Sequence, residues 1–283
     1  MRKISAILSV YNEESLLGLC LKQIEPYVDE IVIVDGGPLG PSDDKTPDIV
    51  KDFTKAKYLS GTYKTRTGAW DLTSQRNHGI SEASGDVYLF LSADMLFYNF
   101  EYLCEVIRKE EDVKVFFCNT VEFWLDTNHI RLYAQLANLS IPGGVSEAVA
   151  IARESQPIAG EHGSLEIVTP KPREQMMVGN TTKYHLGWIR PFKSQVEKHI
   201  RHIEQGRWGD AGKKLMEGTQ QKLEQWAILH VLSYKQIPSV DFRFQFPDEW
   251  QGIKDMNYLN GQSDFVKYYE ERYGTSFLRG IKS

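Results

Sequence analysis

The feature that most constrains this chain is an alternation of apolar, β-branched runs with amphipathic stretches through roughly its first 120 residues. The apolar runs predict strands at residues 4–10, 30–34, 57–59, 87–91 and 113–121. The amphipathic stretches predict helices near residues 13–27, 46–53 and 72–83. Strands that alternate with crossover helices build a mainly parallel sheet. We therefore expect an α/β fold, with a Rossmann-like, mainly parallel sheet flanked by helices.

Helical spacing returns in the C-terminal third of the chain, at residues 194–205, 220–234 and 263–273. Between these helices and the alternating region the pattern loosens, and loops are marked by proline and glycine. We expect one domain over residues 1–190 and a helical C-terminal extension, residues 191–283, packed on it.

The composition excludes several classes of protein. Hydrophobic residues make up 41% of the chain, enough to bury a large core, and the formal net charge is −5. Such a charge gives no general attraction to nucleic acid or an anionic membrane. The most apolar window, residues 87–91, is far shorter than the roughly 20 residues of a membrane helix. We expect neither a nucleic-acid partner nor an integral membrane segment.

The three cysteines, Cys20, Cys104 and Cys118, lie far apart and lack metal-ligand spacing. Their odd number is typical of buried thiols in a reducing compartment. The first apolar run is also too short for the core of a signal peptide. The sequence therefore predicts a cytoplasmic protein without disulfides or a zinc site.

Polar groups follow three of the predicted strands at the point where each strand ends. The segments are Val10-Tyr11-Asn12-Glu13-Glu14, Val34-Asp35-Gly36-Gly37 and Leu91-Ser92-Ala93-Asp94. Open α/β sheets bind ligands at the carboxyl ends of their strands, so these segments should converge on one rim. Between them stand Arg76-Asn77-His78-Gly79-Ile80 and Ala83-Ser84-Gly85-Asp86.

These motifs, with a late His185, resemble the family 2 glycosyltransferases, which have a GT-A fold. The resemblance is specific over residues 4–94 and again around His185. It implies an inverting, metal-assisted transferase that moves a sugar from a UDP- or GDP-sugar to an acceptor hydroxyl. The acceptor stays open among glycans, lipid-linked glycans, proteins and small molecules.

The resemblance implies a nucleotide site formed by Val10, Tyr11, Glu13, Asp35, Arg76 and Ser92. Tyr11 can stack on a base, Asp35 can accept a base N–H, and the Arg76 guanidinium can meet a diphosphate. The alternatives are packing of Tyr11 on the first helix, a turn role for Asp35, and pairing of Arg76 with Asp86.

The same resemblance implies a cation site at Asp94 and His185. Asp94 matches the last acid of the family's Asp-x-Asp motif, and His185 matches the histidine that completes the metal shell. A carboxylate, an imidazole and phosphate oxygens suit Mn²⁺ or Mg²⁺. Ser92 stands where the motif has its first acid, which removes one negative charge. The alternatives are a helix cap for Asp94 and a structural histidine for His185.

Inverting transfer also needs a general base within reach of the acceptor hydroxyl. The candidates are Glu147, Glu161 and Glu166, and we favour Glu161 because glycines flank the segment Gly160-Glu161-His162-Gly163. Two other functions stay open. A nucleotidyltransferase would need a glycine-rich basic loop after the first strand, which Tyr11-Asn12-Glu13-Glu14 is not. A non-catalytic nucleotide-sugar-binding protein is consistent with Ser92.

Overall fold

The structure is a computed structural model that describes residues 1–66, 68, 70–124, 126–131, 148–159, 165–166, 171–204, 218–232, 239–241, 250, 253, 256, 267–268 and 271–272. The chain divides into two compact units: Met1–Thr120 with Ala137–His185, and Val121–Leu136 with Leu186–Ser283. The expected boundary at residue 190 and the packing of the C-terminal extension remain predictions. Within the described ranges, no helix combines the length and apolarity needed to cross a membrane.

The first unit is built on a mixed sheet with the strand order β6-β8-β4-β1-β2-β3. These strands are β1 (Ile4–Val10), β2 (Glu30–Asp35), β3 (Ala56–Ser60), β4 (Val87–Leu91), β6 (Val115–Trp124) and β8 (Ala148–Ala152). The four strands from β4 to β3 are parallel, whereas β8 runs antiparallel to both β4 and β6. The predicted α/β class is confirmed, with the parallel strands confined to one half of the sheet.

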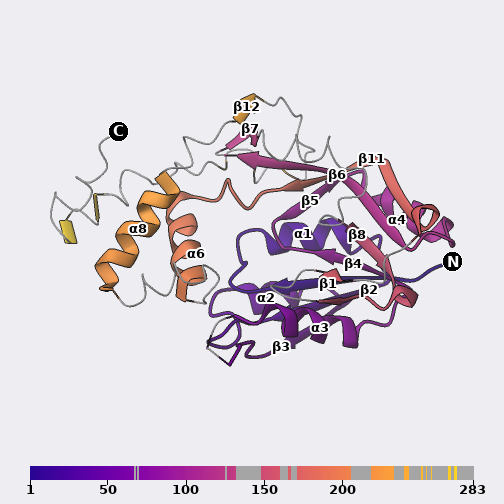
Figure 1. The fold of residues 1–283 in the computed structure, drawn as a ribbon, viewed down its shortest axis with the longest axis horizontal. Coiled ribbons are helices and arrows are strands. Elements are labelled where there is room, and N and C mark those ends of the chain that lie inside the picture. Colours follow the sequence, from indigo (N-terminus) through magenta and orange to yellow (C-terminus); the bar gives the residue numbers. More distant parts are fainter. Residues whose placement is uncertain are drawn as a thin grey trace. The chain divides into compact units, whose positions relative to one another are not determined.

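Helices cover both faces of the parallel strands. The chain steps from β1 to β2 to β3 in one direction and then returns past β1 to β4. Right-handed crossovers therefore place α1 (Leu17–Ile24) and α2 (Thr46–Val50) on one face and α3 (Leu72–Glu82) on the other. Figure 1 shows α1 and α3 on opposite sides of the strands, and α1 contacts α2.

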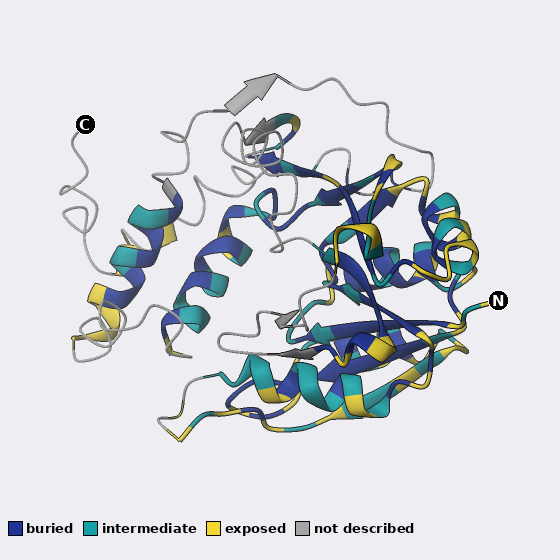
Figure 2. Ribbon diagram, turned by 45° about the vertical axis from the view of Figure 1, so that its right-hand side comes forward, coloured by how far each residue is buried: buried dark blue, intermediate teal, exposed yellow. Residues whose placement is uncertain are grey.

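Strands β1, β2 and β4 are almost entirely buried, whereas β3 has only partly buried and exposed residues and the helices keep partly exposed outer faces (Figure 2). On the α3 side, the core includes Ile7, Val32, Val34 and Tyr88. Gly79 of α3 lies directly on this surface: a Cβ there would stand 2.6 Å from Ile7 Cγ2 and 3.0 Å from Val34 Cγ2. The glycine of the Arg-Asn-x-Gly motif thus lets α3 approach the sheet closely.

Three parts of the first unit differ from expectation. The helix predicted over residues 13–27 spans only Leu17–Ile24, and Asn12, ahead of it, takes a left-handed φ of 56°. No residue range was predicted for the helix α4 (Phe100–Lys109), although its buried residues recur at helical spacing. Asp94 is followed directly by a strand, β5 (Met95–Tyr98), which pairs antiparallel with β11 (Gln175–His185).

In the second unit, the described helices are α6 (Phe192–Glu204) and α8 (Gln220–Leu232), which pack on each other. They match the helices predicted at residues 194–205 and 220–234. Strand β7 (Asp126–Arg131) pairs antiparallel with the end of β6 and with β12 (Ser239–Asp241). Most of the helix expected at residues 263–273 lies outside the described residues.

Candidate functional site

The carboxyl ends of β1, β2 and β4 are level with one another. Val10 pairs with Asp35 across β1 and β2, and Leu8 pairs with Leu91 across β1 and β4. The strand order reverses between β1 and β4, and ligands of open α/β sheets bind at such a switch point. Tyr11 and Ser92 are the first residues beyond those strand ends. The structure therefore brings the three predicted polar segments to one edge.

The loops that follow β1 and β2 are joined by hydrogen bonds. The Asn12 amide N–H donates to Ser42 Oγ at 2.8 Å, and Asn12 Nδ2 donates to Asp43 Oδ1 at 2.7 Å. The Asp43 N–H returns a bond to Asn12 Oδ1 at 3.0 Å. The Glu13 N–H donates to Thr46 Oγ1 at 2.8 Å. These bonds fix the backbone of Glu13 in the segment that carries Tyr11.

Asp35 is fully buried at the end of β2. Its Oδ1 accepts from Ser42 Oγ at 2.5 Å, and its Oδ2 accepts from the Ser42 N–H at 3.1 Å and from Tyr58 Oη at 2.5 Å. Burial, followed by the bond to Asp35, raises the pKa of Tyr58, so the phenol stays a donor. Oδ1 thus accepts one of these bonds and Oδ2 accepts two.

Tyr11 packs on a loop and on another aromatic residue. A Cβ on Gly37 would lie 2.9 Å from Tyr11 Cε1, so the tyrosine ring rests on the Gly37 backbone. The centroid of the Trp70 ring lies 5.9 Å from that of the Tyr11 ring, and the two rings are tilted by 57°. Val10, one residue earlier, is buried, and its carbonyl accepts from the Gly36 N–H at 3.0 Å and from Gln75 Nε2 at 3.1 Å.

Arg76 lies in the first turns of α3, which begin at this same edge. Asp71 caps the helix by accepting from the Ser74 N–H at 2.9 Å. The neighbouring Gln75 side chain bonds the ends of β1 and β2, which fixes the start of the helix there. Asp86, the alternative partner for Arg76, precedes β4 at the opposite edge and accepts from the Lys3 N–H at 2.8 Å.

Asp94 and His185 are brought together although they are far apart in the sequence. A turn closed by a 3.1 Å bond from the Met95 N–H to the Ser92 carbonyl leads into β5. In the β5–β11 ladder, His185 pairs with Met95, the residue after Asp94. The result is a separation of 3.6 Å between His185 Nε2 and Asp94 Oδ2. The histidine side chain is 22% exposed and the carboxylate 8%.

This pair fits a divalent cation. Two atoms that each lie about 2.1 Å from one ion, at angles between about 90° and 120°, are about 3.0–3.6 Å apart. The observed separation falls at the upper end of that range, and a carboxylate with an imidazole suits Mn²⁺. Among the residues the structure describes, no group of three or more His, Cys, Asp or Glu is placed to hold a metal. The remaining positions would belong to substrate or water.

The negative charge around Asp94 also reaches α1. Cys20 is fully buried, and its Sγ lies 3.8 Å from the Ser92 carbonyl. Burial, with smaller contributions from the carboxylates of Asp94 and Glu13, raises the pKa of this thiol to about 12. Cys20 is therefore an un-ionised thiol packed against the turn that leads to Asp94.

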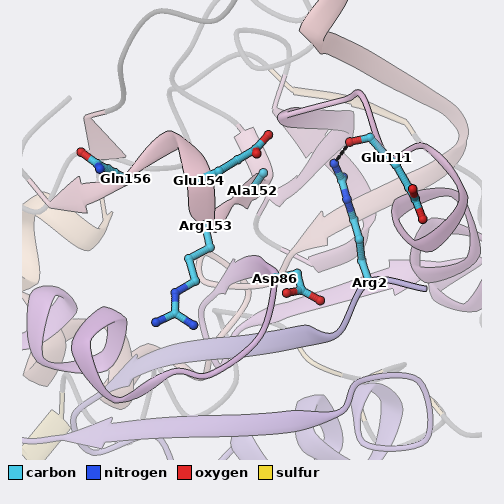
Figure 3. A pocket seen from close by; sticks show the side chains of 7 residues that line it. All are labelled: Arg2, Asp86, Glu111, Ala152, Arg153, Glu154 and Gln156. Atoms are coloured by element: carbon cyan, nitrogen blue, oxygen red, sulfur yellow. Dashed lines mark hydrogen bonds between the residues drawn. The ribbon is translucent and has the colours of Figure 1, made fainter.

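A pocket of about 670 Å³ lies at the opposite edge of the sheet (Figure 3). Its lining residues are Arg2, Asp86, Glu111, Ala152, Arg153, Glu154 and Gln156. Arg2 donates to the carbonyls of Val113, at 2.8 Å, and Glu111. Arg2 and Asp86 thus tie the amino end of β1 to the segments that precede β6 and β4. The pocket is separate from the candidate site.

The three candidate bases cannot be compared in the structure. Glu147 and Glu161 lie outside the described residues, and only the backbone of Glu166 is described, in β10 (Leu165–Glu166). Sequence reasoning also missed four side chains at the site: Ser42, Tyr58, Trp70 and Gln75. Gln75 directly precedes the recognised motif Arg76-Asn77-His78-Gly79-Ile80, whereas the other three carry no signal in the sequence.

The chain was compared with known proteins. The family model described as glycosyl transferase family 2 matches residues 5–150. A TPR repeat-containing protein of Synechococcus elongatus is 35% identical over 94 residues, which are 33% of this chain. The match spans only 21% of that cyanobacterial protein.

Three solved structures are similar at low sequence identity. Staphylococcus aureus TarS 1–349 in complex with UDP is 14% identical, with coverage of 93% of this chain and 78% of that one and a TM-score of 0.46. A glucosyl-3-phosphoglycerate synthase from Mycobacterium tuberculosis is 15% identical, with coverage of 87% and 88% and a TM-score of 0.43. The mannosyltransferase PcManGT from Pyrobaculum calidifontis is 15% identical, with coverage of 82% and 74% and a TM-score of 0.43.

Proposed function

The chain belongs to glycosyl transferase family 2, and from this premise we propose that it transfers a sugar from a UDP- or GDP-sugar to an acceptor hydroxyl, with inversion. The observation that carries the proposal is the 3.6 Å approach of Asp94 Oδ2 and His185 Nε2 at the rim where the nucleotide segments meet. The acceptor is a hydroxyl of a glycan, a lipid-linked glycan, a protein or a small molecule.

The donor nucleotide occupies the edge formed by the ends of β1, β2 and β4. Tyr11 supplies a stacking surface for the base, and Asp35 accepts a base N–H. Arg76, at the start of α3, meets the diphosphate. The nucleotide site is completed by three neighbours of these residues. Val10 contributes backbone groups, and Glu13 and Ser92 contribute polar groups.

Asp94 and His185 hold Mn²⁺ or Mg²⁺ in this proposal. When bound, the cation neutralises charge on the diphosphate leaving group. Asp94 and His185 would hold the cation at the rim, beside the diphosphate. Because Ser92-Ala93-Asp94 contains a single acid, the site carries less negative charge than a two-acid motif would. Ser92 can instead bond a ribose hydroxyl.

Glu161 is proposed as the general base that accepts the proton of the attacking hydroxyl. If so, Glu161→Gln leaves donor affinity nearly unchanged and lowers transfer roughly 100-fold or more. Transfer within a few-fold of the original rate would eliminate Glu161 and move the search to Glu147 and Glu166. We also propose a cytoplasmic location, supported by the burial of all three cysteines.

The test is incubation with UDP-, GDP- and dTDP-sugars and Mn²⁺, with free nucleoside diphosphate as the readout. Slow release is expected for a UDP- or GDP-sugar, and Asp94→Asn should abolish it because the near-isosteric amide lacks the charge that binds the ion. A variant that keeps more than about a tenth of the rate, a loss of only ~1.4 kcal/mol, would refute the role of Asp94.

Two outcomes would replace the proposal itself. Pyrophosphate released from nucleoside triphosphates would identify a nucleotidyltransferase. Nucleotide-sugar binding without any turnover would identify a non-catalytic binding protein.

A further inference from the structure

One buried side chain outside the predicted site, that of Gln75, forms hydrogen bonds with both β1 and β2 and with Trp70. Gln75 is fully buried in the first turns of α3. Its Nε2 donates to the Val10 carbonyl at 3.1 Å and to the Val34 carbonyl at 2.7 Å. Its Oε1 accepts from Trp70 Nε1 at 3.1 Å. Both amide protons and one oxygen lone pair are therefore in use.

Each of these three bonds ends next to the nucleotide segments. Val10 directly precedes Tyr11, and Val34 directly precedes Asp35. Trp70 lies 5.9 Å from Tyr11 between ring centroids, at a tilt of 57°. At this tilt the two rings cannot both stack on one base, so one presents its face and the other its edge.

We propose that Gln75 is a positioning residue for nucleotide recognition, and that Trp70 is a second aromatic wall of the base site beside Tyr11. This inference rests on the proposed nucleotide-sugar function. Gln75 acts by holding the Trp70 indole and the ends of β1 and β2 in one fixed arrangement, and Trp70 contacts the base.

The chain offers a matched control for Gln75. Gln23 of α1 also ties a helix to a strand through its amide, donating to the Phe97 carbonyl at 2.9 Å and accepting from the Phe97 N–H at 2.8 Å. Its two bonds are of the same kind, but they reach β5 and not the Tyr11–Trp70 pair. Gln23→Leu therefore reproduces the loss of an amide tie without disturbing the aromatic wall.

The experiment measures the affinities of UDP and GDP, with Mn²⁺ present, by isothermal titration calorimetry. Trp70→Phe keeps an aromatic ring but removes the N–H that bonds Gln75, whereas Gln75→Leu removes the whole tie. We expect each to weaken binding of the preferred nucleotide about 3- to 10-fold, the range of one hydrogen bond. The double variant should bind no more weakly than the weaker single variant, because coupled partners are not additive.

A kinetic readout separates positioning from general damage. In Gln75→Leu and Trp70→Phe the donor KM should rise while kcat at saturating donor stays within about twofold, as for groups that bind donor and transition state equally. In titrations without Mn²⁺, Gln23→Leu should leave nucleotide affinity unchanged even if it lowers the melting temperature, because β5 bears on Asp94 and His185 and not on the base.

Three results would overturn the inference. Unchanged affinity in both Trp70→Phe and Gln75→Leu would show that the tie does not serve recognition. An equal loss in Gln23→Leu would show that the effect is general destabilisation. If the unaltered protein binds neither UDP nor GDP, the proposed function fails, and the inference fails with it.

Discussion

Acidification should weaken the packing of α6 on α8, because a neutral histidine is buried between them. His199 is only 4% exposed, and its Nδ1 bonds the Gln195 carbonyl at 2.8 Å. Its ring lies 4.9 Å from the His230 ring, which in turn stacks on Trp226. Burial, reinforced by the charges of His230 and Lys198, lowers the pKa of His199 from 6.5 to about 4.

The sign and size of the effect follow from this pKa. The unfolded chain takes up a proton near pH 6.5 and the folded chain only near pH 4, so the stability that is complete above pH 6.5 is lost as the pH falls. Integration over this interval gives a loss of about 2 kcal/mol at pH 5 and about 3 kcal/mol below pH 4. The pKa of His230 is also lowered by burial, which adds in the same direction.

The assay is urea unfolding at pH 7.5 and pH 5.0, monitored by tryptophan fluorescence, which includes the signal of Trp226. Between these pH values the midpoint should fall by roughly 1 M more in the unaltered protein than in His199→Phe. The variant keeps an aromatic ring but cannot take up a proton, and all other titrating groups are shared. The same pH dependence in both proteins would refute the reasoning.

Three further substitutions test the close packing of Gly85 on β1 and the candidate site. Gly85→Ala would place a Cβ 2.9 Å from the Ser5 backbone nitrogen, so thermal unfolding should show a loss of about 1–3 kcal/mol, and an unchanged melting temperature would contradict the close approach. Gly37→Ala would place a Cβ 2.9 Å from Tyr11 Cε1 and displace the ring, so the donor KM should rise with little change in stability; an unchanged KM would count against stacking on Tyr11. Ser92→Asp should tighten Mn²⁺ binding in a metal titration while nucleotide affinity stays similar or improves, and loss of nucleotide binding would show that Ser92 has a different role.

The parallel half of the sheet was predictable because its signal is local. β1 and β4 have the predicted bounds, and β2 and β3 differ by one or two residues at their ends. A helix separates each of these strands from the next, and the membership in family 2 confirms the resemblance drawn from its motifs. The Gly79 contact with β1 and β2 gives the physical reason for one of those motifs.

The parts that were missed depend on partners distant in the sequence. β5 is a four-residue strand whose partner, β11, lies some 80 residues later, so nothing local marks it. α1 starts late because Asn12 and Glu13 bond the loop after β2. α4 did carry a local signal, since Phe100, Leu103, Cys104 and Ile107 recur at helical spacing.

The candidate site also has one part that was predictable from the sequence and one part that was not. The segments that carry Tyr11, Asp35 and Asp94 were predictable from their positions after strands, and the meeting of Asp94 with His185 was implied by the family resemblance. The bonds that Ser42 and Tyr58 make to Asp35 come from separate loops and strands. Such bonds depend on tertiary geometry that no short pattern records.

The central claim is that Asp94 and His185 together hold the cation that binds the nucleoside diphosphate. Its most direct test is calorimetric titration of UDP and of GDP into metal-free protein, with and without Mn²⁺, for the unaltered chain, Asp94→Asn and His185→Ala. We expect Mn²⁺ to tighten binding of one nucleotide by about tenfold or more, ~1.4 kcal/mol, and each substitution to remove that gain. An equal gain from Mn²⁺ in all three proteins would contradict the claim.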